Sequence, residues 1–118
     1  MIRFYGYKKC STSTKGEKFL KNHSIDYEFT DITLNPPSKE ELTKIISQTG
    51  KPIQKFFNTS GVLYREMKLK DTLKTLSDDE KIDLLSQHGK LIKRPLLSNS
   101  MKSSVGFNEQ EFTSIYLK

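Results

Sequence analysis

Residues 7–15 read Tyr-Lys-Lys-Cys-Ser-Thr-Ser-Thr-Lys and contain Cys10, the only cysteine of the chain. The apolar run before this stretch, over residues 1–6, predicts a short strand, and residues 13–22 after it predict a helix. The hydroxyl residues between strand and helix can cap the free backbone N–H groups of the helix. The stretch therefore predicts a cysteine on a turn from strand to helix.

A sulfur atom at that position faces the positive end of the helix dipole. Lys8, Lys9 and Lys15 are close to it in sequence. Both influences favour the thiolate over the thiol, so we expect Cys10 to be a reactive thiol. The alternative is that Cys10 is a small buried hydrophobic residue, which is the usual role of a single cysteine in a cytosolic protein.

The length and composition suit one domain with a core of its own. The chain has 118 residues, of which 34% are hydrophobic and 29% charged. No apolar run reaches the length of a membrane span, and the N-terminus lacks a secretory pattern, so we expect the protein in the cytoplasm. We also expect a monomer. A single cysteine excludes an internal disulfide and a cysteine-based zinc site, and His23 and His88 share no motif, so no metal site is predicted.

The chain is basic, with a formal net charge of +6 and a pI near 9.4. The lysines are spread along the sequence rather than gathered on one predicted helix, and no nucleic-acid-binding motif is present. We therefore expect a solvated basic surface that attracts anionic small molecules or acidic partners, without direct nucleic-acid binding.

Residues 25–32 alternate between apolar and polar side chains, which predicts a half-buried strand. A right-handed crossover through the first helix makes this strand parallel to the first one. Residues 36–89 are predicted to be helical throughout their length. Two capping boxes support this prediction, at the pairs Ser38/Glu41 and Ser77/Glu80.

The strand pattern returns after the helical stretch, at residues 91–97. Pro95 cannot donate to a central ladder, so it should start the strand or lie at its edge. Residues 104–107 predict a short partner strand, and Asn108 is placed to cap a last helix. The order of elements is thus strand, helix, strand, helical insert, hairpin, helix.

This order resembles a thioredoxin-like fold, an α/β fold with a mixed four-stranded sheet and here an inserted helical subdomain. Several short strings sharpen the match to the ArsC/Spx family, which contains glutaredoxin-coupled arsenate reductases and the Spx transcriptional regulators. They lie at residues 7–12, 58–61, 64–66, 91–95 and 105–107. The resemblance covers essentially residues 1–118, as a single domain with a helical insert at about 36–89.

The resemblance implies roles for individual residues. Cys10 matches the nucleophilic cysteine of the family, and Pro95 matches the cis-proline that borders the active thiol in this fold. Arg94 matches an arginine that helps to hold the oxyanion in the arsenate reductases, a task that suits the guanidinium fork. The alternative for Arg94 is a surface ion pair.

The hydroxyls and backbone N–H groups of Ser11, Thr12 and Ser13 are expected to bind an anion or a thiol adduct at the helix start. Ser13 replaces the second cysteine of the Cys-x-x-Cys pair of Spx, so no disulfide can form within the turn. The further arginines of the arsenate reductases are also missing, because residues 57–60 and 104–107 contain none.

The sequence thus predicts an enzyme, a thiol-dependent oxidoreductase with Cys10 as its single nucleophile and no bound cofactor. An external thiol must release the adduct: glutathione, another low-molecular-weight thiol, or a glutaredoxin- or thioredoxin-like protein. Arsenate and disulfides both stay open as substrates. The alternatives are a non-catalytic, Spx-like regulator that binds an RNA polymerase subunit, and a domain whose cysteine is inert.

Overall fold

Four strands form one mixed sheet at the centre of the computed structural model, which describes residues 1–117. Its order is β2-β1-β3-β4. The strands are β1 (Ile2–Gly6), β2 (Tyr27–Asp31), β3 (Leu96–Ser98) and β4 (Ser103–Val105). β1 and β2 are parallel, with Phe4 opposite Phe29, whereas β3 is antiparallel to both β1 and β4. The predicted α/β class with a mixed four-stranded sheet is confirmed.

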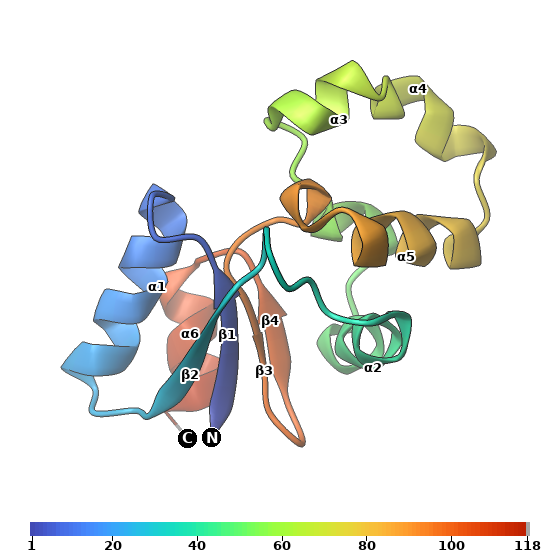
Figure 1. Cartoon of the computed structure of the whole chain (residues 1–118). Coiled ribbons are helices and arrows are strands. Elements are labelled where there is room, and N and C mark those ends of the chain that lie inside the picture. The colour runs from blue at the N-terminus through green and yellow to red at the C-terminus, as the bar shows by residue number, and fades with distance from the viewer. Residues whose placement is uncertain (118) are drawn as a thin grey trace.

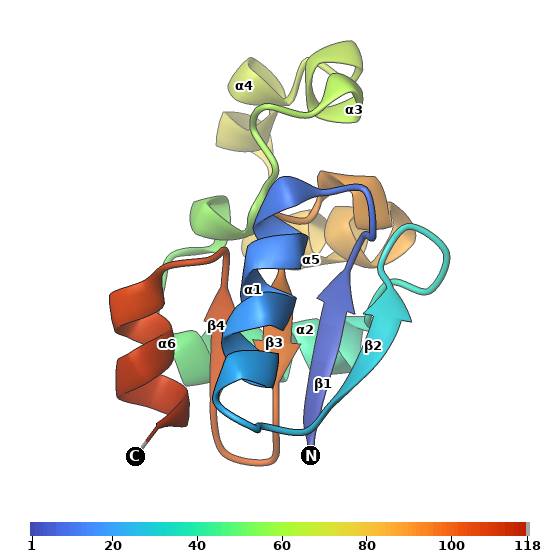
Figure 2. The ribbon, with the colours of Figure 1, turned by 90° about the vertical axis from the view of Figure 1, so that its left-hand side faces the viewer.

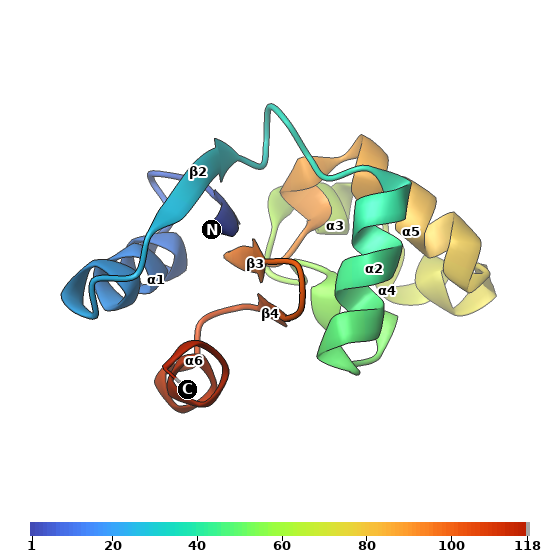
Figure 3. The ribbon, with the colours of Figure 1, turned by 90° about the horizontal axis from the view of Figure 1, so that it is seen from below.

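Helices cover both faces of this sheet (Figures 1 and 3). α1 (Ser11–Asn22) connects β1 to β2, and α6 (Glu109–Tyr116) follows β4; these two lie on one face. α2 (Lys39–Thr49) and α5 (Asp78–Gln87) lie on the other. None of the helices within residues 1–117 combines the length and the apolar character that a membrane span requires.

The chain between β2 and β3 is built from helices and short connecting loops. Besides α2 and α5 it contains five shorter helical pieces, η1 (Ile53–Phe56), α3 (Val62–Glu66), α4 (Leu69–Thr72), η2 (Leu73–Thr75) and η3 (Gly89–Leu91). α3 and α4 project beyond the sheet at the end where β1 finishes (Figure 2). The prediction of helix throughout 36–89 is therefore right in kind, with loops between the pieces.

Alternation along the central strands divides the core into two clusters. Phe4 and Leu97 face α1 and α6, where they pack with Phe19, Leu20 and Phe112. Tyr5 and Leu96, their neighbours in sequence, face the other way and pack with the helices of the insert. Successive strand side chains point to opposite faces, so one short strand supplies both cores.

The predicted strand at residues 91–97 is wrong in its first half, because β3 begins only at Leu96. Pro95 precedes it directly, as expected of a residue that cannot donate to the ladder. Leu91 and Ile92 are fully buried all the same, and Ile92 forms an isolated antiparallel bridge with Phe57. Their apolar pattern thus reflects burial against the helical insert rather than a place in the sheet.

The predicted helix caps are confirmed, with one difference. The Ser77 hydroxyl and the Glu80 carboxylate form a reciprocal capping box, and Asn108 accepts from the Glu111 N–H at 2.9 Å. At α2 the Ser38 hydroxyl accepts from the Glu41 N–H, but the Glu41 carboxylate accepts the Tyr5 hydroxyl at 2.8 Å instead of returning to the cap. A contact to the sheet replaces the second half of that capping box.

Candidate active site

Cys10 is the N-cap residue of α1, just beyond the carboxyl end of β1. The helix begins at Ser11, two residues earlier than the sequence predicted, so the hydroxyl residues form its first turn rather than a linker before it. The Cys10 N–H donates to the Tyr7 carbonyl at 2.9 Å, and the Cys10 carbonyl accepts the N–H and the hydroxyl of Thr14. The backbone is fixed on both sides while the side chain stays partly exposed.

Thr12 connects the sulfur to the proline loop. Its hydroxyl lies 3.1 Å from Cys10 Sγ and donates to the Arg94 carbonyl, also at 3.1 Å. While Cys10 is a thiol, the S–H can donate to this hydroxyl and the hydroxyl to the carbonyl. Once the sulfur is ionised, the same hydroxyl can turn and donate to the thiolate, which is a charge-assisted and stronger bond.

Ser13 is fully buried at the position where a Cys-x-x-Cys turn has its second thiol. Its hydroxyl accepts the Tyr7 N–H at 3.1 Å. Its backbone N–H and hydroxyl both help to lower the pKa of the Cys10 thiol. Ser11, by contrast, is exposed, and no side-chain hydrogen bond of Ser11 is found within residues 1–117. Of the three hydroxyl residues predicted for the site, Thr12 contacts the sulfur directly and Ser13 helps to lower its pKa.

These contacts set the acidity of the thiol. Burial raises the pKa of Cys10, but the hydrogen bonds from Thr12 and Ser13 and the positive charge of Arg94 outweigh it and lower the pKa to about 7. An ordinary cysteine titrates at about 8.5 and is only a few per cent thiolate at neutral pH, whereas this one is about half ionised. The structure therefore supports a reactive thiol rather than a small buried hydrophobic residue.

Lys8, which the sequence placed beside the thiol, is directed elsewhere. Its ammonium group lies 3.0 Å from a Glu17 carboxylate oxygen and 4.0 Å from the centre of the Phe29 ring. Glu17 is buried and also accepts the Tyr27 hydroxyl at 2.7 Å. Lys8 thus neutralises a buried acid on the side of β2, and Arg94 is the cation that acts on Cys10.

The Arg94–Pro95 segment closes the other side of the site, and its peptide bond is cis, as the family resemblance implied. Pro95 is buried against α1: a Cβ added to Gly16 would lie 3.1 Å from both Pro95 Cγ and the Phe4 ring. This close approach explains a glycine inside the helix. The Arg94 guanidinium carbon lies 5.6 Å from the centre of the Tyr7 ring, and Arg94 forms no ion pair within residues 1–117.

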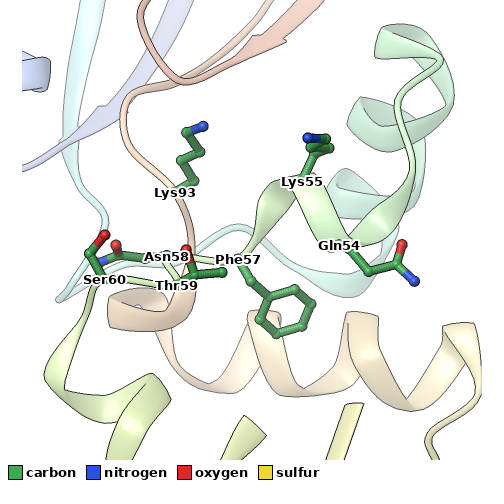
Figure 4. Close-up of a pocket in the computed structure, with 7 residues that line it drawn as sticks. All are labelled: Gln54, Lys55, Phe57, Asn58, Thr59, Ser60 and Lys93. Carbon is green, nitrogen blue, oxygen red and sulfur yellow. The ribbon is translucent and has the colours of Figure 1, made fainter. Parts of the chain in front are cut away.

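A basic groove, which we define by Lys55 and Lys93, adjoins this segment. Both lysines line two neighbouring hollows of about 340 and 390 Å³. The first hollow is bordered by Phe57, Asn58, Thr59 and Ser60, and Figure 4 shows both lysines beside that segment. The second runs past Gly106 to Lys51, whose ammonium group is paired with Glu111 at 2.8 Å.

The groove brings lysines to the two segments in which the sequence showed no arginine, 57–60 and 104–107. Lys93 was identifiable only as the neighbour of Arg94, and Lys55 belongs to η1, which is distant in sequence. The backbone explains how they meet, because the Lys93 N–H donates to the Phe56 carbonyl at 2.8 Å and the Asn58 N–H to the Leu91 carbonyl at 2.7 Å.

The order β2-β1-β3-β4, with a cysteine at the start of α1 and a cis-proline before β3, defines a thioredoxin-like fold with a single thiol at its site. A family model extends the match over residues 5–115. The chain belongs to the ArsC family.

Two relatives match this chain over most of its length. An uncharacterised protein of Bacillus subtilis, YusI, is 45% identical over 94% of both chains. Streptococcus pyogenes has a global transcriptional regulator, Spx, that is 27% identical over 94% of this chain and 81% of its own length.

Two solved structures are similar. An ArsC family related protein from Bacteroides fragilis has a TM-score of 0.93 and 42% identity, covering 96% of this chain and 95% of its own. A possible arsenate reductase from Streptococcus mutans has a TM-score of 0.85 and 42% identity, covering 92% of each chain.

Proposed function

We propose that the protein is a thiol-dependent oxidoreductase in which Cys10 is the single nucleophile. The observation that supports this function best is the state of the sulfur: partly exposed at the start of α1, bonded by Thr12 and Ser13, and with a pKa lowered to about 7. A thiol with a pKa near the ambient pH combines a large thiolate fraction with good nucleophilicity.

The first step is attack of the Cys10 thiolate on one sulfur of a disulfide R–S–S–R′. The new bond joins Cys10 to R–S, and R′–S⁻ leaves with the electron pair of the broken S–S bond and takes a proton from water. Free N–H groups at the start of α1 and the Arg94 guanidinium stabilise the negative charge that spreads over the three sulfurs in the transition state.

The second step needs a thiol from outside, because Ser13 occupies the position of a resolving cysteine. An external thiolate G–S⁻ attacks the R–S sulfur of the mixed disulfide, forms R–S–S–G and returns Cys10 to the thiolate. The basic groove favours a thiol that carries carboxylates, such as glutathione, since Lys55 and Lys93 can pair with them.

Arsenate is the second substrate to test, because a structure that is 42% identical is described as a possible arsenate reductase. Arg94 is available for one of its oxygens, while any further cations must come from the basic groove. Lysine offers a point charge rather than a bidentate fork, so we expect weaker selection of a tetrahedral oxyanion than an arginine cluster gives.

The test is a reductase assay in which glutathione is the reductant and either a glutathionylated peptide or arsenate is the substrate. Cys10→Ser should abolish turnover of whichever substrate is used. Arg94→Ala should slow arsenate reduction more than disulfide exchange if the guanidinium holds the oxyanion. Wild-type activity equal to that of Cys10→Ser with both substrates would overturn the proposal.

A regulatory function is the second candidate, and the observation that favours it is the relation to Spx along 94% of this chain. In that case the protein binds an RNA polymerase subunit, and Cys10 acts as a sensor through a reversible cap such as glutathionylation. Retention of purified polymerase by both wild type and Cys10→Ser, with no turnover in the reductase assay, would favour the regulator over the enzyme.

A further inference from the structure

A second group of lysines lies apart from Cys10, on the helical insert. We propose that Lys81, Lys70 and Lys74 form a binding site for a small polyanion that carries phosphate or pyrophosphate. These three side chains line one cavity of about 220 Å³, together with Leu73 and the polar residues Gln54, Thr59 and Tyr64. This site is independent of the thiol chemistry proposed above.

Lys81 is the residue that makes this cavity unusual. It belongs to the first turns of α5, only 7% of its surface is exposed, and within residues 1–117 its ammonium group has no hydrogen bond and no carboxylate at ion-pair distance. No side-chain nitrogen in the described chain is both fully enclosed and unpartnered, so this ammonium group retains contact with solvent. Lys81 is also one of the residues that line the cavity.

The stem of Lys81 is buried while its ammonium group reaches solvent, and no carboxylate within residues 1–117 lies at ion-pair distance to neutralise that charge. Two further lysines on the same cavity add repulsion. Lys74 is only loosely compensated, at 4.0 Å from an exposed Asp71 carboxylate, and Lys70 has no ion pair within residues 1–117. Lys70 and Lys74 are exposed, and an anion in the cavity can interact with all three charges at once.

The size and lining of the cavity indicate the class of ligand. A volume of about 220 Å³ holds roughly seven waters at about 30 Å³ each, which admits a phosphate or pyrophosphate but no macromolecule. Three ammonium groups match a multiply charged anion better than a single carboxylate. The hydroxyls of Thr59 and Tyr64 and the Gln54 amide can donate to the remaining oxygens.

Thermal unfolding of the full chain with phosphate, pyrophosphate or citrate tests the site, with sodium chloride matched for ionic strength. Pyrophosphate should raise the Tm by roughly 5 °C at about ten times its Kd, because it binds the folded state alone. Phosphate should act more weakly. An effect of citrate equal to that of pyrophosphate would overturn the preference for phosphoryl groups, and no shift beyond that of chloride would overturn the site.

Lys81→Met keeps the apolar stem and removes the charge, and Lys44→Gln on α2 is the matched control, an exposed lysine outside the cavity. Lys81→Met should have an unchanged or higher Tm without anion and should lose the pyrophosphate shift, whereas Lys44→Gln should retain it. If Lys81→Met fails to fold, Lys70→Gln should still reduce pyrophosphate affinity several-fold by calorimetry. Equal pyrophosphate binding by the cavity variants and the control would overturn the proposal.

Discussion

The surroundings of Cys10 and the helical insert use polar groups in opposite ways. At Cys10 the decisive groups are backbone N–H groups and short hydroxyls, held by a buried Ser13 and by the packing of Pro95 against α1. In the insert the decisive groups are lysine ammonium ions at the ends of long side chains that line separate hollows.

This difference separates two tasks. Short groups on a fixed backbone lose little freedom when they bond to the sulfur, so they can tune its pKa and direct its attack. Lysine side chains can follow ligands of different shape, so they select for charge rather than for geometry. On this view the β1–α1 turn determines the chemistry, and the basic groove of Lys55 and Lys93 selects the anionic molecules that reach it.

The largest effect on stability is expected where the insert meets the sheet. A Cβ at Gly89 would overlap the Ile32 carbonyl oxygen, which is backbone and cannot turn away. Gly89→Ala should therefore lower the free energy of unfolding by about 3 kcal/mol or more, measured by urea denaturation. Lys90→Ala, at the exposed next residue, should change it by less than about 0.5 kcal/mol. Similar values for the two variants would show that the insert is not tightly joined to β2.

A smaller loss of stability is expected from substitutions in the β1–α1 turn. Ser13→Ala leaves the Tyr7 N–H without its buried acceptor and should cost about 1–3 kcal/mol in urea unfolding. Thr12→Ala removes an exposed hydroxyl and should cost less than about 0.5 kcal/mol. Both variants should raise the thiol pKa, followed by the absorbance of the thiolate at 240 nm as a general probe. If only Thr12→Ala raises it, Ser13 serves the fold and not the sulfur.

Much of the fold and of the Cys10 turn could be predicted from the sequence. The features that could not be predicted have physical causes. Local patterns predicted β1 and β2, the caps at Ser77 and Asn108 and the turn at Cys10, because these depend on neighbours in the chain. Lys8 was expected to favour the thiolate from its place in the sequence, but its ammonium group lies at Glu17 and Phe29, which the tertiary fold brings to it.

The lysine-lined hollows could not be predicted at all. They join side chains from segments that only the tertiary fold brings together, such as η1 and the residues before Pro95.

The next expected effect is on the pH dependence of thiol–disulfide exchange at Cys10. The rate should rise with pH to a plateau with a midpoint near 7, the pKa of Cys10. Arg94→Ala should move that midpoint upward, because a cation that favours the thiolate is lost, although Asp31 nearby offsets part of its charge. Arg65→Ala, which removes an exposed arginine that donates to the Ser60 carbonyl, is the control. An unchanged midpoint in Arg94→Ala would remove this arginine from the site.

The lowered pKa of Cys10 also makes the stability of the folded chain depend on pH. The folded thiol ionises at about 7 and the unfolded one at about 8.5, so between these values the unfolded chain binds more protons. Stability should therefore rise with pH across this window and be lost as pH falls through 7. Subtracting the pH profile of Cys10→Ser from that of wild type isolates this contribution, and a difference that is flat with pH would contradict the lowered pKa.

The smallest effect is expected from the basic groove. Lys93→Gln should raise the KM for glutathione a few-fold and leave kcat nearly unchanged, because an exposed lysine contributes charge and no contact with the reacting sulfur. Lys44→Gln has the same change in net charge far from the groove and should leave KM unaltered. About 0.5 M salt should abolish the difference between the variants, since screening at that concentration acts within a few ångströms. A fall in kcat with KM unchanged would place Lys93 at the thiol itself, and the separation of chemistry from ligand selection between the two regions would then be lost.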